Sequence, residues 1–130
     1  MSPDEELGLI RHAQQRHRAF TETADAIEGG GFRFSAKDNL CAVGFQARAG
    51  SDVLEGYRPP FDATAVHRLK AAGGQLVGKT TMDEFGFGTF STNSAHGVPL
   101  NPFDVERSCG GSSGGAGAAA CLIPGHIALG

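Results

Sequence analysis

A cluster of glycine and serine, Gly110-Gly111-Ser112-Ser113-Gly114-Gly115, runs directly into a stretch of small apolar residues at 116–122. A flexible linker can have the same composition, but an alanine-rich continuation predicts a buried, closely packed helix instead. Glycines ahead of a helix let backbone N–H groups converge, and they let hydroxyls be held in geometries that are typical of active sites. We therefore expect close packing here, with the two serines as the chemically active groups.

Apolar periodicity and glycine breakers divide the rest of the chain into helices and strands. Ser2 and Glu5 fit a capping box, and apolar residues at helical spacing from Leu7 to Ile27 predict one long first helix that stops at Gly29-Gly30-Gly31. Further helices are expected at 63–72, capped by Asp62, at 81–87, opened by a capping box over 81–84, and at 116–122. Strands are expected at 32–36, 75–78 and 126–129. This alternation predicts an α/β protein.

Charge and composition exclude several classes of function. The net charge is −3, so the basic footprint of a nucleic-acid-binding chain is missing. No apolar run is long enough for a membrane helix, and the acidic start differs from a signal peptide, which predicts a cytoplasmic protein without a membrane role. Three cysteines without a C-x-x-C pair predict reduced thiols, and five histidines without ligand spacing predict no metal site.

Lys37 follows the apolar run Phe34-Ser35-Ala36 and precedes Asp38. A lysine at the end of a core strand is partly desolvated, which lowers its pKa from ~10.4 toward neutrality, as a lysine base requires. The alternative is a surface lysine beside a turn aspartate.

Residues Gly73 to Thr80 formally match the phosphate-binding pattern G-x-x-x-x-G-K-[ST]. A true P-loop follows a strand and opens a helix, whereas here a predicted helix comes first and Leu76-Val77 supply an apolar run. The favoured interpretation is a helix C-cap, a strand and a Lys-Thr turn. A nucleotide-binding module stays as a minor alternative.

Five segments in order give the chain a family resemblance from about Phe32 to Gly130. Together they resemble the N-terminal part of the amidase signature family. The segments are Phe34-Ser35-Ala36-Lys37-Asp38-Asn39, Pro59-Pro60-Phe61-Asp62-Ala63-Thr64, Gly78-Lys79-Thr80-Thr81-Met82-Asp83-Glu84-Phe85, Asn101-Pro102-Phe103-Asp104 and Gly110-Gly111-Ser112-Ser113-Gly114-Gly115.

The resemblance implies a fold and a catalytic unit. The fold is a mixed sheet flanked by helices, with residues 1–31 as an N-terminal helix and glycine-rich turn and residues 32–130 as the N-terminal part of the amidase domain. The family catalyses amide hydrolysis with a Ser–cis-Ser–Lys unit, in which Lys37 matches the lysine and Ser112 the serine at the cis peptide. The residues matching the supporting loop are Gly110, Gly111, Ser113 and Gly114.

Within the family, Met82-Asp83-Glu84-Phe85 is similar to the A subunits of tRNA-dependent amidotransferases, and the chain resembles their archaeal type. Such a protein releases ammonia from glutamine. Its B subunit partner, assembled with a C subunit, uses ATP and Mg to amidate Glu-tRNA(Gln) or Asp-tRNA(Asn). The resemblance implies no cofactor on this chain itself, and it leaves the choice between the two tRNAs open.

The family's nucleophilic serine and oxyanion donors match no residue here. In the family they lie just beyond the strand that begins at His126, so we expect them after Gly130. An end inside an apolar strand predicts an N-terminal fragment, and we expect residues 1–130 alone to be inactive. Alternatives are a family member that hydrolyses small amides without a partner, and a non-catalytic split or remnant chain.

Overall fold

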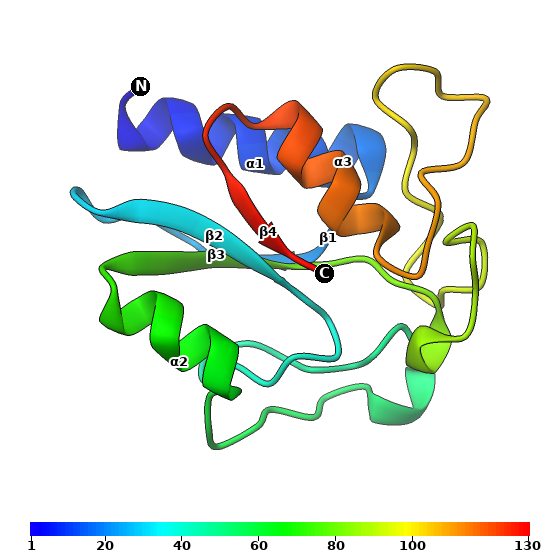
Figure 1. The fold of residues 1–130 in the computed structure, drawn as a ribbon, viewed down its shortest axis with the longest axis horizontal. Coiled ribbons are helices and arrows are strands. Elements are labelled where there is room, and N and C mark those ends of the chain that lie inside the picture. The colour runs from blue at the N-terminus through cyan, green and yellow to red at the C-terminus, as the bar shows by residue number, and fades with distance from the viewer.

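A computed structural model describes all residues from 1 to 130 (Figure 1). Its helices and strands alternate along the chain and are α1 (Pro3–His17), β1 (Phe20–Thr23), β2 (Phe32–Lys37), α2 (Thr64–Ala71), β3 (Gly74–Thr80), α3 (Gly114–Leu122) and β4 (Ile127–Leu129). Short 3-10 turns cover Asp52–Leu54 and Glu84–Gly86. None of the helices combines the length and apolar character that a membrane span requires.

The four strands form one mixed sheet in the order β1-β3-β2-β4. β2 is central and runs parallel to both β3 and β4, whereas β1 pairs antiparallel with the outer edge of β3. Parallel pairing brings the carboxyl ends of β2, β3 and β4 to the same edge of the sheet. The α/β class and the mixed sheet flanked by helices are as predicted.

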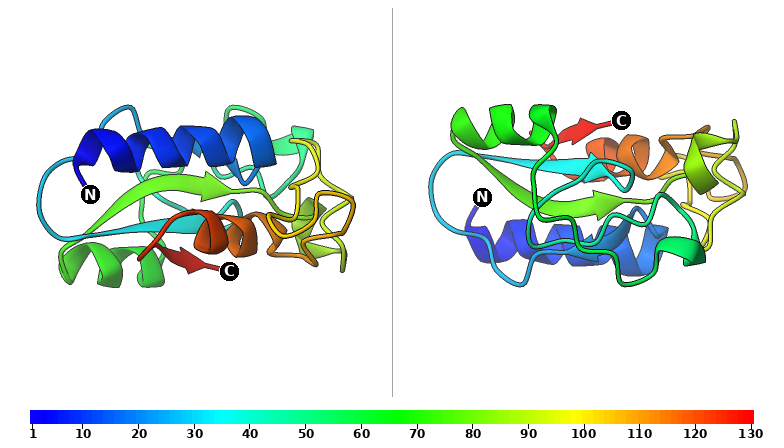
Figure 2. Two further views of the ribbon diagram at one scale, coloured as in Figure 1. Left: turned by 90° about the horizontal axis from the view of Figure 1, so that it is seen from above. Right: turned by 90° about the horizontal axis from the view of Figure 1, so that it is seen from below.

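Helices cover both faces of this sheet. Figure 2 shows α1 and α3 over the sheet when seen from above and α2 over it when seen from below. Leu76 and Val77, adjacent on β3, explain the arrangement because successive strand residues point to opposite faces. Val77 joins a core with residues of α1 and α3, and Leu76 joins a second core with Val66 of α2 and Phe34 of β2.

The predicted first helix is too long. It ends at His17 because Arg18 turns into the left-handed region (φ 52°), and the chain then forms β1. Phe20 fits the helical period, but it lies in the strand β1, which pairs with β3, and its side chain is buried there. The carbonyls at the helix end accept hydrogen bonds from elsewhere, the His17 carbonyl from the Leu100 N–H at 2.8 Å. Tertiary partners therefore override the helical period beyond residue 17.

Two of the three predicted helix caps are also wrong. Ser2 and Glu5 form the expected capping box. Asp62 does not cap α2, because its carboxylate accepts the Val43 N–H at 2.8 Å and pairs with Lys70 at 3.0 Å. Thr81 opens no capping box either, because its hydroxyl donates to the Arg18 carbonyl at 2.6 Å. Residues 81–87 contain only a single 3-10 turn in place of the expected helix.

Gly115 of α3 packs against backbone, whereas Gly117 of the same helix faces open space. A Cβ at Gly115 would lie under 3.0 Å from backbone atoms of Ala19 and Thr81, and none would lie within 4 Å of one at Gly117. We expect Gly115→Ala to lower the free energy of unfolding by at least about 2 kcal/mol. Gly117→Ala should leave it unchanged or raise it by up to about 1 kcal/mol, because alanine is the better helix former. Urea denaturation followed by circular dichroism measures both, and equal effects would contradict this packing.

His126 predicts a dependence of stability on pH. Its Nε2 lies 2.9 Å from the Ser35 hydroxyl, and burial lowers its pKa from the ordinary 6.5 to about 4. Since the unfolded chain then binds a proton that the native state excludes, stability should fall as the pH drops from 6.5 toward 4, by at most about 1.4 kcal/mol per pH unit. His126→Gln, which does not titrate, should flatten this part of the profile. Urea midpoints of both proteins across this range test it, and parallel profiles would refute it.

Candidate active site

The candidate site lies where the carboxyl ends of β2 and β3 meet the segment that leads into α3. Lys37 is the last residue of β2 and stands opposite Thr80 of β3. Residues 110–113 pass over this edge before α3 begins at Gly114. The topology therefore brings together the lysine and the glycine-serine cluster, which are more than 70 residues apart in the sequence.

The Lys37 amine lies between two serine hydroxyls. Its Nζ is 2.6 Å from Ser112 Oγ and 2.7 Å from Ser113 Oγ, and the residue is only 9% exposed. Burial is the largest influence and lowers the pKa of Lys37, and the nearby Asp83 carboxylate opposes it. The prediction of a desolvated lysine is confirmed, and the surface-lysine alternative is wrong. A lowered pKa makes the neutral amine more accessible, so this group can accept a proton from a hydroxyl.

The direct contact between Ser113 and Lys37 was not anticipated. The resemblance placed Ser113 only in the supporting loop, yet its hydroxyl is nearly as close to the amine as that of Ser112. The adjacent serines in a glycine-rich segment were the available signal, but sequence alone does not show which way each hydroxyl points.

The glycines of the loop are required by their surroundings. The Gly111–Ser112 peptide is cis, and Gly110 has φ of 73°, which favours glycine. A Cβ at Gly111 would collide with the Asp83 carboxylate, and one at Gly114 would collide with the Ser91 side chain. All three glycines therefore give the loop a backbone path that other residues would not allow.

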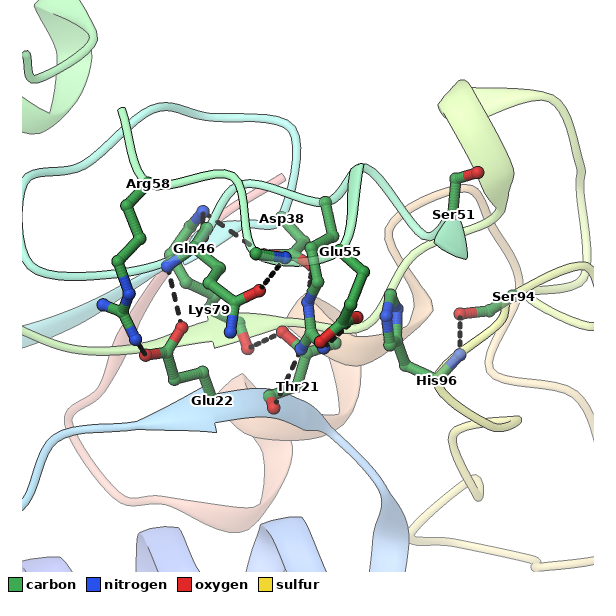
Figure 3. Close-up of polar contacts among 12 residues, drawn as sticks. Thr21, Glu22, Asp38, Gln46, Ser51, Glu55, Arg58, Lys79, Ser94 and His96 are labelled. Atoms are coloured by element: carbon green, nitrogen blue, oxygen red, sulfur yellow. Dashed lines mark hydrogen bonds and ion pairs between the residues drawn. The ribbon is translucent and has the colours of Figure 1, made fainter. Parts of the chain in front are cut away.

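A buried ion cluster lies directly behind the site. Lys79 Nζ is 3.3 Å from Asp38 Oδ1 and 3.0 Å from the Gln46 carbonyl, and Arg48 Nε is 3.8 Å from Asp38 Oδ2. Figure 3 shows Lys79, Asp38 and Gln46 within a set of polar side chains that extends from Arg58 on one side to His96 and Ser94 on the other. Burial lowers the pKa of Lys79 and raises that of Asp38. Because Asp38 follows Lys37, the cluster fixes the chain at the residue next to the candidate base.

The same cluster decides against a P-loop at Gly73–Thr80. The segment is the strand β3 rather than a loop, and the side chain of Lys79 is fully buried in its pair with Asp38. A phosphate-binding lysine must reach its ligand from a loop ahead of a helix. The favoured interpretation was correct for the C-cap and the strand, but Lys79 and Thr80 belong to the strand and not to a turn.

One group of potential metal ligands lies apart from the site. Ligand atoms of Asp52, Glu55 and His96 lie within 4.8 Å of one another. The Glu55 carboxylate is already paired with Arg48 at 3.1 Å, and that positive charge also lowers the pKa of His96, after burial. A cation would have to compete with the guanidinium, so we assign no site to this group.

The strand β4 leads the chain back to the candidate site. It runs parallel to β2, with Leu129 opposite Ala36, and Gly130 comes next. A Cβ at Gly130 would lie 3.0 Å from the Ser113 hydroxyl oxygen. Gly130 is therefore adjacent to Ser113, one of the two serines that contact Lys37.

Comparison with known proteins identifies the class to which this site belongs. The family model described as "Amidase" matches residues 11–130. The chain therefore belongs to the amidase family.

Similar curated proteins are named as A subunits of glutamyl-tRNA(Gln) amidotransferase. The chain is 43% identical to the chloroplastic/mitochondrial protein of Arabidopsis thaliana, over 94% of this chain and 23% of that protein. It is 45% identical to the proteins of Methanospirillum hungatei and Thermus thermophilus, over 85% and 98% of this chain and 27% of each relative. The chain thus spans about a quarter of the length of these relatives. Because the identities to the plant, archaeal and bacterial proteins are so similar, they do not show that this chain is of the archaeal type.

Solved structures show the same fold. The glutamyl-tRNA(Gln) amidotransferase A subunit of Thermotoga maritima matches with a TM-score of 0.84 and 36% identity, over 93% of this chain and 28% of that one. The peptide amidase of Stenotrophomonas maltophilia matches with a TM-score of 0.79 and 29% identity, over 92% of this chain and 30% of that one.

The buried pair of Lys79 and Asp38 predicts a large cost for breaking it. Lys79→Met should lower the free energy of unfolding by about 3 kcal/mol or more, because it leaves a buried carboxylate without its nearest cation. Arg107→Met breaks the exposed pair with Asp104, where the side chains are 79% and 46% exposed, and should cost less than about 1 kcal/mol. Urea denaturation of the two variants compares them directly. A loss at Lys79 no larger than that at Arg107 would contradict the role of the cluster.

Proposed function

We propose that this chain is part of the glutamine-hydrolysing A subunit of a tRNA-dependent amidotransferase. The names of relatives at 43–47% identity support this proposal. The observation that carries it is the 2.6 Å contact between the desolvated Lys37 amine and the Ser112 hydroxyl. A lysine and a serine in this arrangement form a general base with a relay, a known variant of triad chemistry.

In the proposed mechanism, neutral Lys37 accepts the Ser112 proton while Ser112 takes the proton of a nucleophilic serine. The family resemblance implies that this serine lies among the residues that follow Gly130 in the longer relatives, and Gly130 itself lies beside Ser113. The nucleophile attacks the glutamine carboxamide carbon. The C–N bond breaks, ammonia leaves with the proton returned through Ser112, and water hydrolyses the acyl-serine ester to glutamate. Residues 1–130 alone then have no glutaminase activity.

The proposal includes partners and a cellular place. The ammonia is used by a B subunit, in a complex that also contains a C subunit, to convert mischarged Glu-tRNA(Gln) or Asp-tRNA(Asn). ATP and Mg belong to that partner, and this chain holds no cofactor. The complex works in the cytoplasm.

Ammonia release from glutamine tests the function, measured on the longer protein that contains this segment in complex with its B subunit. Lys37→Ala and Ser112→Ala should each lower kcat by about 1,000-fold or more, because each removes a member of the proton relay. The matched control is Lys70→Ala. It removes a lysine of α2 that pairs with Asp62, and it should leave kcat unchanged. Full activity of the Lys37 variant, or none in the unmodified protein, would refute the proposal.

A second candidate is an amidase for small amides that needs no partner, favoured by the fold match to the peptide amidase. This candidate predicts turnover of simple carboxamides without a B subunit, with no gain when one is added. The amidotransferase proposal predicts that the protein prefers glutamine and co-purifies with a B subunit. Measuring both substrates with and without the B subunit separates the two.

A further inference from the structure

The Asp83 carboxylate is fully buried beneath the glycine-serine loop and is used by no step of the proposed mechanism. Its Oδ2 accepts the backbone N–H of Ser91 and its Oδ1 that of Asn93, both at 3.0 Å. A buried carboxylate with two backbone donors is a strong, directional anchor. It fixes the irregular segment from Gly88 to Asn93, whose backbone at Ser91 packs against Gly111 of the loop.

The same carboxylate touches the loop that carries Ser112. A Cβ at Gly111 or at Gly88 would lie within 3.0 Å of its atoms, so the carboxylate is packed between the two backbones. The Asp83 backbone N–H also donates to the Ser112 carbonyl at 3.3 Å. Asp83 therefore holds the cis peptide segment through its main chain and packs against it through its side chain.

Ser91 extends this anchor to both ends of the loop. It is fully buried with φ of 56° and is held by its N–H on Asp83. Its hydroxyl donates to the Gly110 carbonyl at 2.7 Å and accepts the Gly114 N–H at 3.0 Å. One hydroxyl thus bridges the residue before and the residue after the segment 111–113, a span that includes both serines in contact with Lys37.

We propose that Asp83 is a positioning residue for the hydrolytic reaction, acting through Ser91 to hold residues 110–114 so that the Ser112 and Ser113 hydroxyls face Lys37. This inference rests on the proposed function and adds a residue to it. The sequence placed Asp83 in an expected capping box and in a segment similar to amidotransferase A subunits, and neither observation gave it a role in the site.

The charge of Asp83 provides a signature that a merely structural residue lacks. Its carboxylate raises the pKa of Lys37 against the effect of burial. The other nearby carboxylates are engaged elsewhere, Asp38 with Lys79 and Glu84 with the Ser51 hydroxyl. A lysine base works when neutral, so activity rises with pH through its pKa. Removing the Asp83 charge lowers that pKa and moves the acidic limb of the rate profile to lower pH.

The test compares three variants of the longer protein in its complex. Asp83→Asn should lower kcat for glutamine at least about 10-fold with KM changed less than about 2-fold, and shift the acidic limb to lower pH. Asp83→Glu keeps the charge but has no room beside Gly111, and Ser91→Ala keeps the charge but loses both loop contacts. Both should lower kcat without moving the limb. Asp104→Asn, on an exposed loop, is the matched control and should change nothing.

An unchanged kcat in Asp83→Asn and Ser91→Ala overturns the proposal, and so does an acidic limb that stays in place when only the charge is removed. Circular dichroism checks that each variant folds. If Asp83→Asn does not fold, the kcat of Ser91→Ala tests the proposal by itself.

A serine-directed fluorophosphonate separates this inference from the proposed function, because its labelling rate reports the nucleophile without glutamine. Labelling of the unmodified protein that slows in the Asp83 and Ser91 variants supports positioning, even where glutamine is not the substrate. Failure of the unmodified protein to label overturns both proposals, whereas labelling without glutamine turnover overturns the proposed function alone.

Discussion

Parallel hydrogen bonding of β2 to strands on both sides decides where the chemistry of this chain can lie. In register with β3 and β4, the carboxyl end of β2 places Lys37 at the edge where the other two strands also end. Loops that follow parallel strands meet at that edge, which is why ligand sites in such sheets form there. The pairing places Thr80 opposite Lys37 and Leu129 opposite Ala36, so the ends of β3 and β4 lie beside the candidate base.

Close approach of backbones is the second constraint, and the small residues of α3 make it possible. Gly115 donates its N–H to the Thr81 carbonyl at 3.0 Å, so α3 is bonded directly to the chain just past β3. A helix with larger residues on this side would stand farther from the sheet and would lift the Ser112 and Ser113 hydroxyls away from Lys37. The alanine-rich composition thus sets a distance as well as a helix.

Sequence patterns predicted most of the fold because they follow local rules. The apolar run before Lys37 and the pair Leu76-Val77 indicated the strands on which the site depends. The strand β1 was missed because Phe20 satisfies a helical period, and only pairing with β3 decides otherwise. Similarly, the cap spacing at residues 81–84 gave no sign that Asp83 accepts bonds from residues 91 and 93, since that contact depends on a long irregular segment.

The candidate site followed the same division. The residue types at Lys37 and Ser112, with the family resemblance, were enough to nominate the pair. The contact of the Ser113 hydroxyl with Lys37, the bridging contacts of the Ser91 hydroxyl and the burial of Asp83 were not predicted. They depend on the direction in which each side chain points, which periodicity does not encode.

The shared position of the Lys37 amine between two hydroxyls has a consequence for reading mutants. When Ser112 is truncated to alanine, the amine keeps its 2.7 Å contact with Ser113, so the base stays tethered where it was. A loss of rate in that variant then reports the missing proton-transfer step and not a displaced Lys37 side chain. The two neighbouring serines thus divide two roles, because Ser113 still holds the amine when Ser112 can no longer transfer the proton. A site with a single hydroxyl cannot separate these two roles.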